Sequence, residues 1–314
     1  MSEKSFSSPL VTHHSFLAFS PSFVHVPLPE GHRFPMGKYA LLSETLTELG
    51  WQIEKAPRAS LEDLQHVHTS AYIQQWSDLS LTPQEERKLG LPQSKELLER
   101  SIVSVGGTVA AMLQVFERGY GINLAGGTHH AFAERGEGFC VFNDLAVASR
   151  KAMAEGLAKK ILIVDLDVHQ GNGTAKIFED EPNVFTLSIH GERNYPFQKE
   201  KSDLDIGLPD GVTDEQYLEV LDEHLPKLFE SFEPNLVFLQ AGVDVLAEDR
   251  YGRMNLSKEG VAERDSRVYK LCFENSIPLV YTMGGGYQKE IEKIVAAHVG
   301  SLERLKNLMT RLQL

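Results

Sequence analysis

Hydrophobic positions recur along this chain with two different periods. Short apolar runs rich in β-branched residues alternate with longer stretches in which an apolar residue returns every three or four positions. The short runs are typical of buried parallel strands, and the longer stretches are typical of amphipathic helices. Strands are predicted at 23–28, 51–54, 121–125, 161–166, 183–189, 235–240 and 278–283. Helices are predicted at 36–49, 60–67, 70–78, 98–119, 143–156, 174–179, 213–232, 258–275 and 288–312.

Two stretches lack either period and are predicted to be loops. Residues 79–94 are polar and contain Pro83, Gly90 and Pro92, whereas residues 190–212 are rich in Gly, Pro, Asn and Asp. A loop as long as the second is usually functional. There is no internal repeat, low-complexity tract or domain linker.

The alternation of strands and helices predicts an α/β protein. We expect a single domain over residues 1–314, with a mostly parallel central sheet flanked by helices on both faces. Its core is expected to run from about residue 20 to about residue 300, after an N-terminal extension of about 15 residues.

Polar and glycine-rich segments follow four of the predicted strands. The segments are Gly126-Gly-Thr-His-His130, Asp167-Val-His169, Ala241-Gly-Val-Asp244 and Gly284-Gly-Gly-Tyr287. Because the carboxyl ends of parallel strands share one edge of a sheet, these side chains should converge there. The sequence therefore places the active site at this edge.

Two carboxylates and one imidazole at this edge form a ligand set for a metal ion. Zinc accepts oxygen and nitrogen ligands of the kind that Asp167, His169 and Asp244 offer. Three protein ligands leave one coordination position open, and zinc-bound water can supply hydroxide near neutral pH. The residues thus favour a catalytic metal site.

The remaining polar groups suit acid–base chemistry. His129 and His130 are candidates for the general base and acid. Each imidazole needs a partner that sets its tautomer, and Asp165 and Asn172 lie close enough in sequence to serve. Tyr287 can direct its hydroxyl toward a carbonyl oxygen as an oxyanion donor.

Composition narrows the setting of this chemistry. The formal charge of −13 argues against binding to nucleic acid or to an anionic membrane, and it suits cationic substrates such as lysine side chains or polyamines. Two cysteines, Cys140 and Cys272, are too few for a disulfide framework and indicate a reducing compartment, which we expect to be the cytoplasm. Neither a signal peptide nor a membrane-spanning run is recognisable.

Each motif alone also has an ordinary structural explanation. Asp165 or Asp244 can cap a helix, the pair His129-His130 can form a polar turn, and Tyr287 can pack on the core. Their joint occurrence at four strand ends makes coincidence improbable.

The motifs together resemble those of zinc-dependent histone deacetylases, which have the arginase–deacetylase fold. The resemblance covers about residues 25–299 and rests on six elements in the family's order. These are His32-Arg33, Gly127-Thr-His-His130, Gly136-Glu-Gly-Phe-Cys140, Asp165–Gly173, Gln240-Ala-Gly-Val-Asp244 and Gly284-Gly-Gly-Tyr287. The resemblance implies that Asp167, His169 and Asp244 hold one zinc ion.

The resemblance also implies catalytic roles. His130 matches the general base and acid, His129 its electrostatic neighbour, and Asp165 the carboxylate that orients His129. Tyr287 matches the residue that polarises the scissile carbonyl. Asn172 stands where class I enzymes have an aspartate, which leaves the protonation state of His130 open and is similar to class II and class IV members.

Further positions match the family's substrate and cation sites. The substrate-tunnel residues implied are Gly138, Phe139, Tyr195, Gly285 and Gly286, and Arg33 matches an arginine near an internal channel. The residues implied for an inner monovalent-cation site, usually potassium, are Asp165, Asp167, His169 and Ser188.

The resemblance implies an amidohydrolase that removes acetyl or longer acyl groups from lysine side chains. Residues 244–252 and 284–289 look most like class IV, whose members favour long acyl chains. An acetylpolyamine amidohydrolase or an acetoin-utilisation-type deacetylase is the alternative enzyme. An inactive acyl-lysine-binding module is the alternative of another class. The oligomeric state stays open.

Overall fold

The short apolar runs assemble into one sheet of eight parallel strands. The computed structural model describes residues 16–312, so the prediction for the first 15 residues lies outside the described part. The strands are β1 Leu17–Ser20, β2 Gln52–Lys55, β3 Tyr120–Asn123, β4 Ile161–Asp165, β5 Val184–Gly191, β6 Leu204–Leu208, β7 Leu236–Gln240 and β8 Leu279–Thr282. Their order across the sheet is β2-β1-β3-β8-β7-β4-β5-β6, and every pair is parallel.

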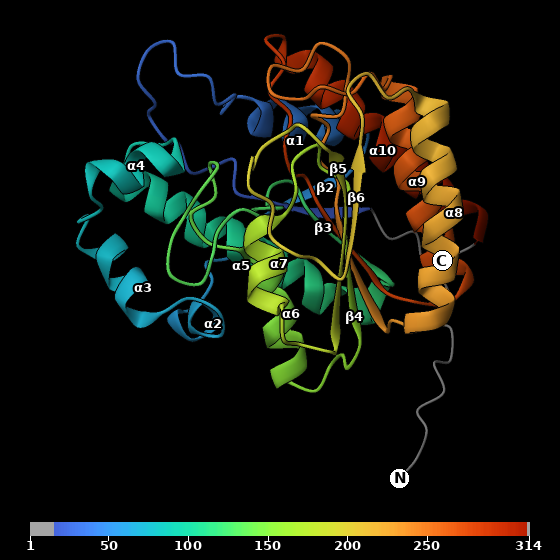
Figure 1. Cartoon of the computed structure of the whole chain (residues 1–314), viewed down its shortest axis with the longest axis horizontal. Helices are drawn as coiled ribbons and strands as arrows, with labels where there is room; N and C mark the ends of the chain where they lie inside the picture. Colours follow the sequence, from blue (N-terminus) through green and yellow to red (C-terminus); the bar gives the residue numbers. More distant parts are fainter. Residues whose placement is uncertain (1–15, 313–314) are drawn as a thin grey trace.

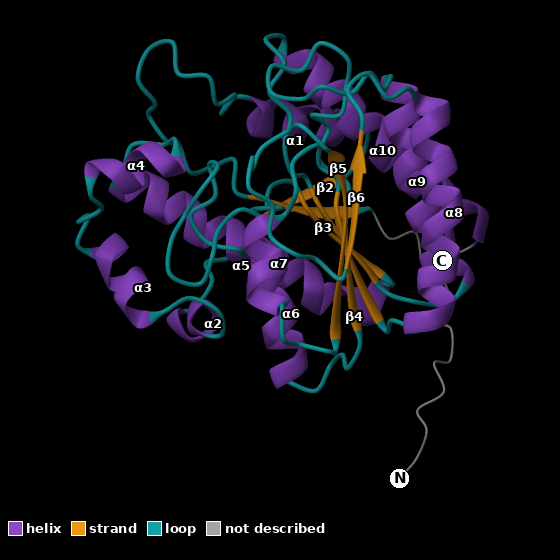
Figure 2. Ribbon diagram, in the orientation of Figure 1, coloured by secondary structure: helices purple, strands orange, loops and turns teal. Residues whose placement is uncertain are grey.

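Helices cover both faces of this sheet, as predicted (Figures 1 and 2). On one face lie α1 Lys38–Glu48, α8 Asp214–Phe232, α9 Lys258–Glu274 and α10 Ile291–Leu312. On the other lie α5 Lys95–Arg118, α6 Asp144–Ala154 and α7 Asn172–Phe178, with the short helices α2 Leu61–Gln65, α3 Ser70–Ser77 and α4 Pro83–Leu89 outside them. None of the helices in residues 16–312 combines the length and the apolar character needed to cross a membrane.

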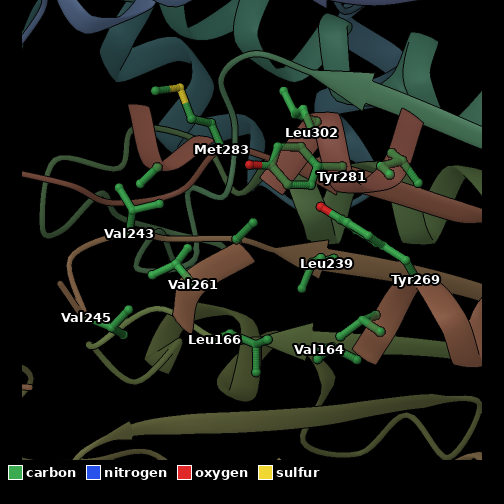
Figure 3. Packing of buried hydrophobic residues seen from close by; sticks show 14 of the residues in the cluster. Val164, Leu166, Leu239, Val243, Val245, Val261, Tyr269, Tyr281, Met283 and Leu302 are labelled. Atoms are coloured by element: carbon green, nitrogen blue, oxygen red, sulfur yellow. The ribbon is translucent and has the colours of Figure 1, made fainter. Parts of the chain in front are cut away.

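The central strands supply side chains to two separate cores. In β4, Leu162 and Val164 pack toward α8 and α9, while Ile161 and Ile163 pack toward α5 and α6. All four are buried because successive side chains of a strand point to opposite faces. Figure 3 shows part of the first core, where Val164 and Leu239 of the strands face Val261 and Tyr269 of α9. This double burial explains why the central strands read as continuous apolar runs.

The predicted strand at 23–28 is wrong. The first strand is β1, and it pairs with β2 and β3. Residues 23–28 are a turn and irregular chain, although Val26 is buried. Pro27 has no N–H to donate to a ladder, and this favours the irregular conformation.

The predicted loop at 79–94 contains the helix α4. Thr82 caps it and forms a reciprocal pair of hydrogen bonds with Glu85, while Pro83 occupies the first turn. Gly90 ends the helix in the left-handed conformation with φ 77°. These cap residues were visible in the sequence, but the helix has only one buried residue, Leu89, and therefore no apolar period.

The predicted loop at 190–212 contains the edge strand β6. It pairs with β5 over residues 204–208, and its alternation of side-chain exposure is typical of an edge strand. β5 also extends into the segment as far as Gly191, and residues 192–203 and 209–212 are irregular, in agreement with the prediction.

Candidate active site and metal centre

Three buried ligand side chains meet where β4 and β7 end. Asp167 and His169 follow β4, and Asp244 follows its neighbour β7. One ligand atom from each lies within 4.8 Å of the others. His169 Nδ1 is 2.9 Å from Asp167 Oδ1 and 3.1 Å from Asp244 Oδ2. The structure thus brings the three predicted metal ligands together.

The chemistry of this cluster fits a divalent cation. Asp244 Oδ2 is buried and accepts no hydrogen bond from the described residues. Burial, together with the charge of Asp167, raises the pKa of Asp244 to about 7. Burial alone would lower the pKa of His169, but its contacts with the carboxylates of Asp167 and Asp244 raise it to about 10. A cation between these groups would relieve the cost of burying the carboxylates.

Neighbouring strand ends hold the ligands in place. Asp167 Oδ2 accepts hydrogen bonds from Gln240 Nε2 at 2.8 Å and from the backbone N–H of Gly285 at 2.9 Å. The second contact requires glycine, because a Cβ at residue 285 would lie 2.1 Å from Asp244 Oδ2. Gln240 belongs to the sequence motif, but its support of a ligand was not predicted.

The two adjacent histidines have different partners. His129 Nδ1 lies 2.6 Å from Asp165 Oδ2, and His130 Nδ1 lies 2.6 Å from Asn172 Oδ1. Burial would lower the pKa of His129, but the charges of Asp165 and Asp167 outweigh it and raise the pKa. Burial lowers the pKa of His130 well below its ordinary value, and the neighbouring histidines lower it further. The surroundings therefore favour the charged form of His129 and the neutral form of His130.

The amide of Asn172 sets the tautomer of His130. Asn172 Nδ2 donates to Glu137 Oε2 at 3.4 Å, so Asn172 Oδ1 faces His130. Because an amide oxygen only accepts, His130 Nδ1 carries the proton. His130 Nε2 is then free to accept one, as a general base must.

Tyr287 lies against the metal cluster inside a group of aromatic rings. Its ring centroid is 6.4 Å from that of His169, 5.6 Å from that of Phe139 and 5.1 Å from that of Tyr251. Its backbone N–H donates to Asp249 Oδ2 at 2.7 Å. Burial, followed by the charges of the nearby carboxylates, raises the pKa of the Tyr287 hydroxyl well above 10. The hydroxyl therefore remains protonated and can donate.

Two of the predicted tunnel residues, Gly138 and Tyr195, lie against His130. Gly138 has φ 52°, and a Cβ there would lie 2.5 Å from His130 Cδ2. Phe139 also has a positive φ, 68°, and its backbone N–H donates to Leu89 O at the end of α4. The ring centroid of Tyr195 lies 5.0 Å from that of His130, and the two rings pack edge to face. Gly286, next to Gly285, has φ 142°.

Two of the residues predicted for a monovalent cation, Asp165 and Ser188, are neighbours in the sheet, and Asp167 and His169 follow β4. Asp165 of β4 is paired with Ser188 of β5. The backbone N–H of Asp167 donates to Asp165 Oδ1 at 3.2 Å, and Ser188 Oγ lies 3.0 Å from His190 Nδ1.

Arg33 is not brought into this site. Its side chain is exposed. The cation beside Tyr287 is instead Lys38, which is fully buried at the start of α1. Lys38 Nζ lies 5.4 Å from the Tyr287 ring centroid and donates to Gly284 O at 3.4 Å and Gly286 O at 3.3 Å.

A second buried cation supports the metal ligands from behind. Arg264 of α9 donates to Leu166 O at 2.9 Å and to Gly242 O at 2.8 Å. Leu166 directly precedes Asp167, and Gly242 lies two residues before Asp244. Arg264 also pairs with Asp265 at 2.8 Å, and both side chains have no exposed area.

Comparisons with known proteins find extensive similarity. The family model described as "Histone deacetylase domain" matches residues 32–302. An uncharacterized protein of Picosynechococcus sp. is 45% identical over 286 residues, covering 90% of this chain and 95% of that protein. Histone deacetylase 2 of Arabidopsis thaliana is 32% identical over 293 residues, covering 89% of this chain and 76% of that protein. The crystal structure of an HDAC homolog complexed with SAHA has a TM-score of 0.78 at 25% identity, covering 93% of this chain and 88% of that one.

Proposed function

Because this chain belongs to the histone deacetylase family, we propose that it is a zinc-dependent hydrolase that removes acyl groups from lysine side chains. The observation that carries the proposal is the buried cluster of Asp167, His169 and Asp244 next to two histidines, one bonded to the carboxylate of Asp165 and one to the amide of Asn172. Zinc held by the cluster would act as a Lewis acid and would lower the pKa of a bound water.

The histidine pair moves the protons of this reaction. Neutral His130 accepts a proton at Nε2 from the attacking water and later returns it to the leaving amine. Positively charged His129 lies beside it and stabilises negative charge that develops on the reacting carbonyl. Asn172 keeps the His130 tautomer fixed through both steps.

Tyr287 polarises the scissile carbonyl. Its hydroxyl is protonated and buried beside the metal cluster, so it can donate to the carbonyl oxygen as negative charge accumulates there. Phe139 and Tyr195 provide apolar walls for the acyl-bearing methylene chain of lysine.

The substrate class follows from the resemblance to class IV deacetylases. We propose acyl-lysine in proteins or peptides, with chains longer than acetyl preferred. Specificity constants measured on one peptide carrying acetyl, octanoyl or myristoyl lysine test this preference. A higher value for acetyl would contradict the long-chain preference and leave the hydrolase proposal intact. Turnover of acetylpolyamines in place of the peptides would favour the alternative enzyme.

A structural potassium ion and a cytoplasmic location complete the proposal. Asp165, Asp167, His169 and Ser188 would hold the potassium ion beneath the metal ligands. Cys140 and Cys272 are buried free thiols, which suit a reducing compartment.

Replacement of a metal ligand tests the proposed function. Asp244→Ala should lose bound zinc and deacylase activity together, because two ligands alone bind zinc weakly. Metal content and hydrolysis of a fluorogenic acyl-lysine peptide measure both effects. Asp222→Ala, which removes an exposed carboxylate paired with Arg267, is the matched control. Stoichiometric zinc with normal activity in Asp244→Ala would reject the assignment. Wild-type protein that binds acyl-lysine without hydrolysis would be a binding module.

A further inference from the structure

Glu137 is a carboxylate at the outer end of a short hydrogen-bond chain that begins at His130. His130 Nδ1 lies 2.6 Å from Asn172 Oδ1, and Asn172 Nδ2 donates to Glu137 Oε2 at 3.4 Å. Asn172 is buried, whereas the Glu137 side chain keeps 15% of its area exposed. The side-chain amide of Asn172 has no third partner among residues 16–312. Within that range, Glu137 is therefore the one group besides His130 that can fix the orientation of this amide.

The backbone around Glu137 is held on two sides. Glu137 and Cys140 exchange backbone hydrogen bonds of 3.1 and 2.8 Å. Between them, Gly138 and Phe139 both have a positive φ, and their N–H groups donate to carbonyl oxygens at the end of α4. This turn lies directly beside His130, because a Cβ on Gly138 would be 2.5 Å from the His130 ring. The Glu137 side chain thus starts from a constrained point next to the imidazole.

The orientation of the Asn172 amide decides which nitrogen of His130 can act as a base. With Oδ1 toward the ring, His130 carries its proton on Nδ1, and Nε2 can accept another. With the amide turned over, Nδ2 would donate to His130 Nδ1, and the ring would carry its proton on Nε2. A ring in that state cannot take a proton from the attacking water. An amide fits both arrangements, so the contact with the ring alone does not select the productive one.

We propose that Glu137 is a positioning residue that holds Asn172 in the productive orientation. A carboxylate only accepts hydrogen bonds, so Glu137 attracts the Nδ2 side of the amide and repels Oδ1. An amide polarised in this way is also a better acceptor for the His130 proton. Glu137 and Asn172 together thus supply one negative charge and one acceptor to the ring, as a single aspartate would. The role rests on the proposed function of His130 as a general base, but the tautomer can be measured without catalysis.

Nuclear magnetic resonance of the purified protein with ¹⁵N-labelled histidine measures the His130 tautomer. In mildly alkaline buffer the wild type should show the proton on His130 Nδ1, and His130→Ala assigns the signal. Glu137→Leu should populate the form protonated on Nε2, since no acceptor then selects the Nδ2 side of Asn172. Glu137→Gln should keep the wild-type form, because its amide oxygen can still accept from Asn172. An unchanged tautomer in Glu137→Leu would overturn the proposal, whether or not the protein is a deacylase.

Steady-state kinetics with an acyl-lysine peptide tests the consequence for catalysis. Glu137→Leu should lower kcat by about tenfold or more and leave KM nearly unchanged, because general-base catalysis contributes roughly a hundredfold or more and part of the protein would hold the wrong tautomer. Glu137→Gln should recover most of this loss. An effect on KM alone would assign Glu137 to substrate binding and overturn the positioning role.

Glu134→Leu is the matched control for both measurements. Glu134 is an exposed carboxylate of the same loop, and it pairs with Arg135, which also lies 3.9 Å from Glu137 Oε2. The variant should keep the wild-type tautomer and the wild-type kcat. A wild type without deacylase activity would contradict the proposed function, and the tautomer of Glu137→Leu would still decide the role of Glu137.

An exchange of the two side-chain types keeps the test decisive if Glu137→Leu does not fold. Asn172→Asp alone places two carboxylates in contact, which repel each other or share a proton, and it should lower kcat. Addition of Glu137→Gln to Asn172→Asp should restore much of the loss, since the pair again carries one negative charge and one hydrogen bond. Such a rescue requires that residues 137 and 172 be coupled. A double variant no more active than Asn172→Asp would reject the proposal.

Discussion

At the scale of single residues, the pKa values of two adjacent histidines are shifted in opposite directions. Their surroundings explain the difference, because His129 faces the carboxylate of Asp165 whereas His130 faces the amide of Asn172. Neighbouring groups with diverging pKa values are a common sign of divided acid–base roles. The neutral charge of Asn172 is therefore important. Its amide oxygen holds the His130 proton at Nδ1, and it does not raise the His130 pKa as a carboxylate would.

The Tyr287 hydroxyl is the residue-scale group whose role can be tested most directly. Tyr287→Phe should lower kcat by roughly a hundredfold or more, the loss expected for one oxyanion donor, and should leave zinc content unchanged. Steady-state kinetics with metal analysis measures both quantities. Tyr251→Phe, in the neighbouring ring, should behave like the wild type. An effect of Tyr287→Phe on KM alone would indicate a packing role.

At the scale of elements, α9 holds the ends of two strands together. The Arg264 guanidinium joins the backbone after β4 to the backbone after β7, and Asp265 balances its charge inside the core. The carbonyls that it binds lie where the chain has left the sheet ladder. The helix thereby fixes the spacing of the proposed metal ligands.

Removal of the Arg264 charge should be costly because it leaves Asp265 alone in the core. Arg264→Met should lower the free energy of unfolding by about 3–5 kcal/mol in urea titrations. The double variant Arg264→Met/Asp265→Asn should be more stable than Arg264→Met, since no isolated charge is left. Additive losses in the double variant would contradict a coupled pair.

The start of α6 should make the fold sensitive to acid. His68 Nε2 accepts the backbone N–H of Asn143, the N-cap of α6, and therefore must be unprotonated. Burial lowers the pKa of His68 to about 4 from an ordinary 6.5. The folded state thus binds fewer protons than the unfolded state between these values. Stability contributed by neutral His68 is complete above pH 6.5 and is lost as pH falls toward 4.

This loss should amount to about 3 kcal/mol at pH 4. Unfolding free energies measured from pH 7 to pH 4 should show a shallower decline in His68→Gln, whose amide oxygen can accept the same hydrogen bond without titrating. His224→Gln, on the partly exposed side of α8, is the control. Equal slopes in His68→Gln and the wild type would exclude His68 as the source.

The elements around the site could be predicted from the sequence because each is buried on both faces and ends in polar groups. The strands β1 and β6 could not, since β1 has only four residues and β6 only five, whereas the edge strand β2 was predicted. The convergence of Asp167, His169 and Asp244 could likewise be predicted, whereas the burial of Lys38 and Arg264 beside them was not. Arg264 lies on the apolar stripe of α9 between Val261 and Val268, so its burial was readable in principle. Its carbonyl partners depend on tertiary contacts and were not.

At the scale of the whole molecule, the formal charge of −13 should attract cationic substrates. We predict that kcat/KM for an acyl-lysine peptide flanked by lysines falls severalfold between about 0.02 and about 0.5 M salt, as screening shortens the range of attraction. An uncharged acyl-lysine derivative is the control and should show little change. Equal salt dependence of the two substrates would show that the net charge does not steer them.

The strand order has a consequence for the synthesis of the protein. β8 lies between β3 and β7, so it joins the segment β2-β1-β3 to the segment β7-β4-β5-β6. It is also the last strand to emerge from the ribosome. Until it does, the nascent chain holds two unconnected half-sheets with open inner edges, and Asp167 lacks the backbone donor of Gly285. The proposed metal site can therefore be completed only after about nine-tenths of the described chain has been made. A ribosome that stalls earlier leaves two unpaired sheet edges exposed to other nascent chains.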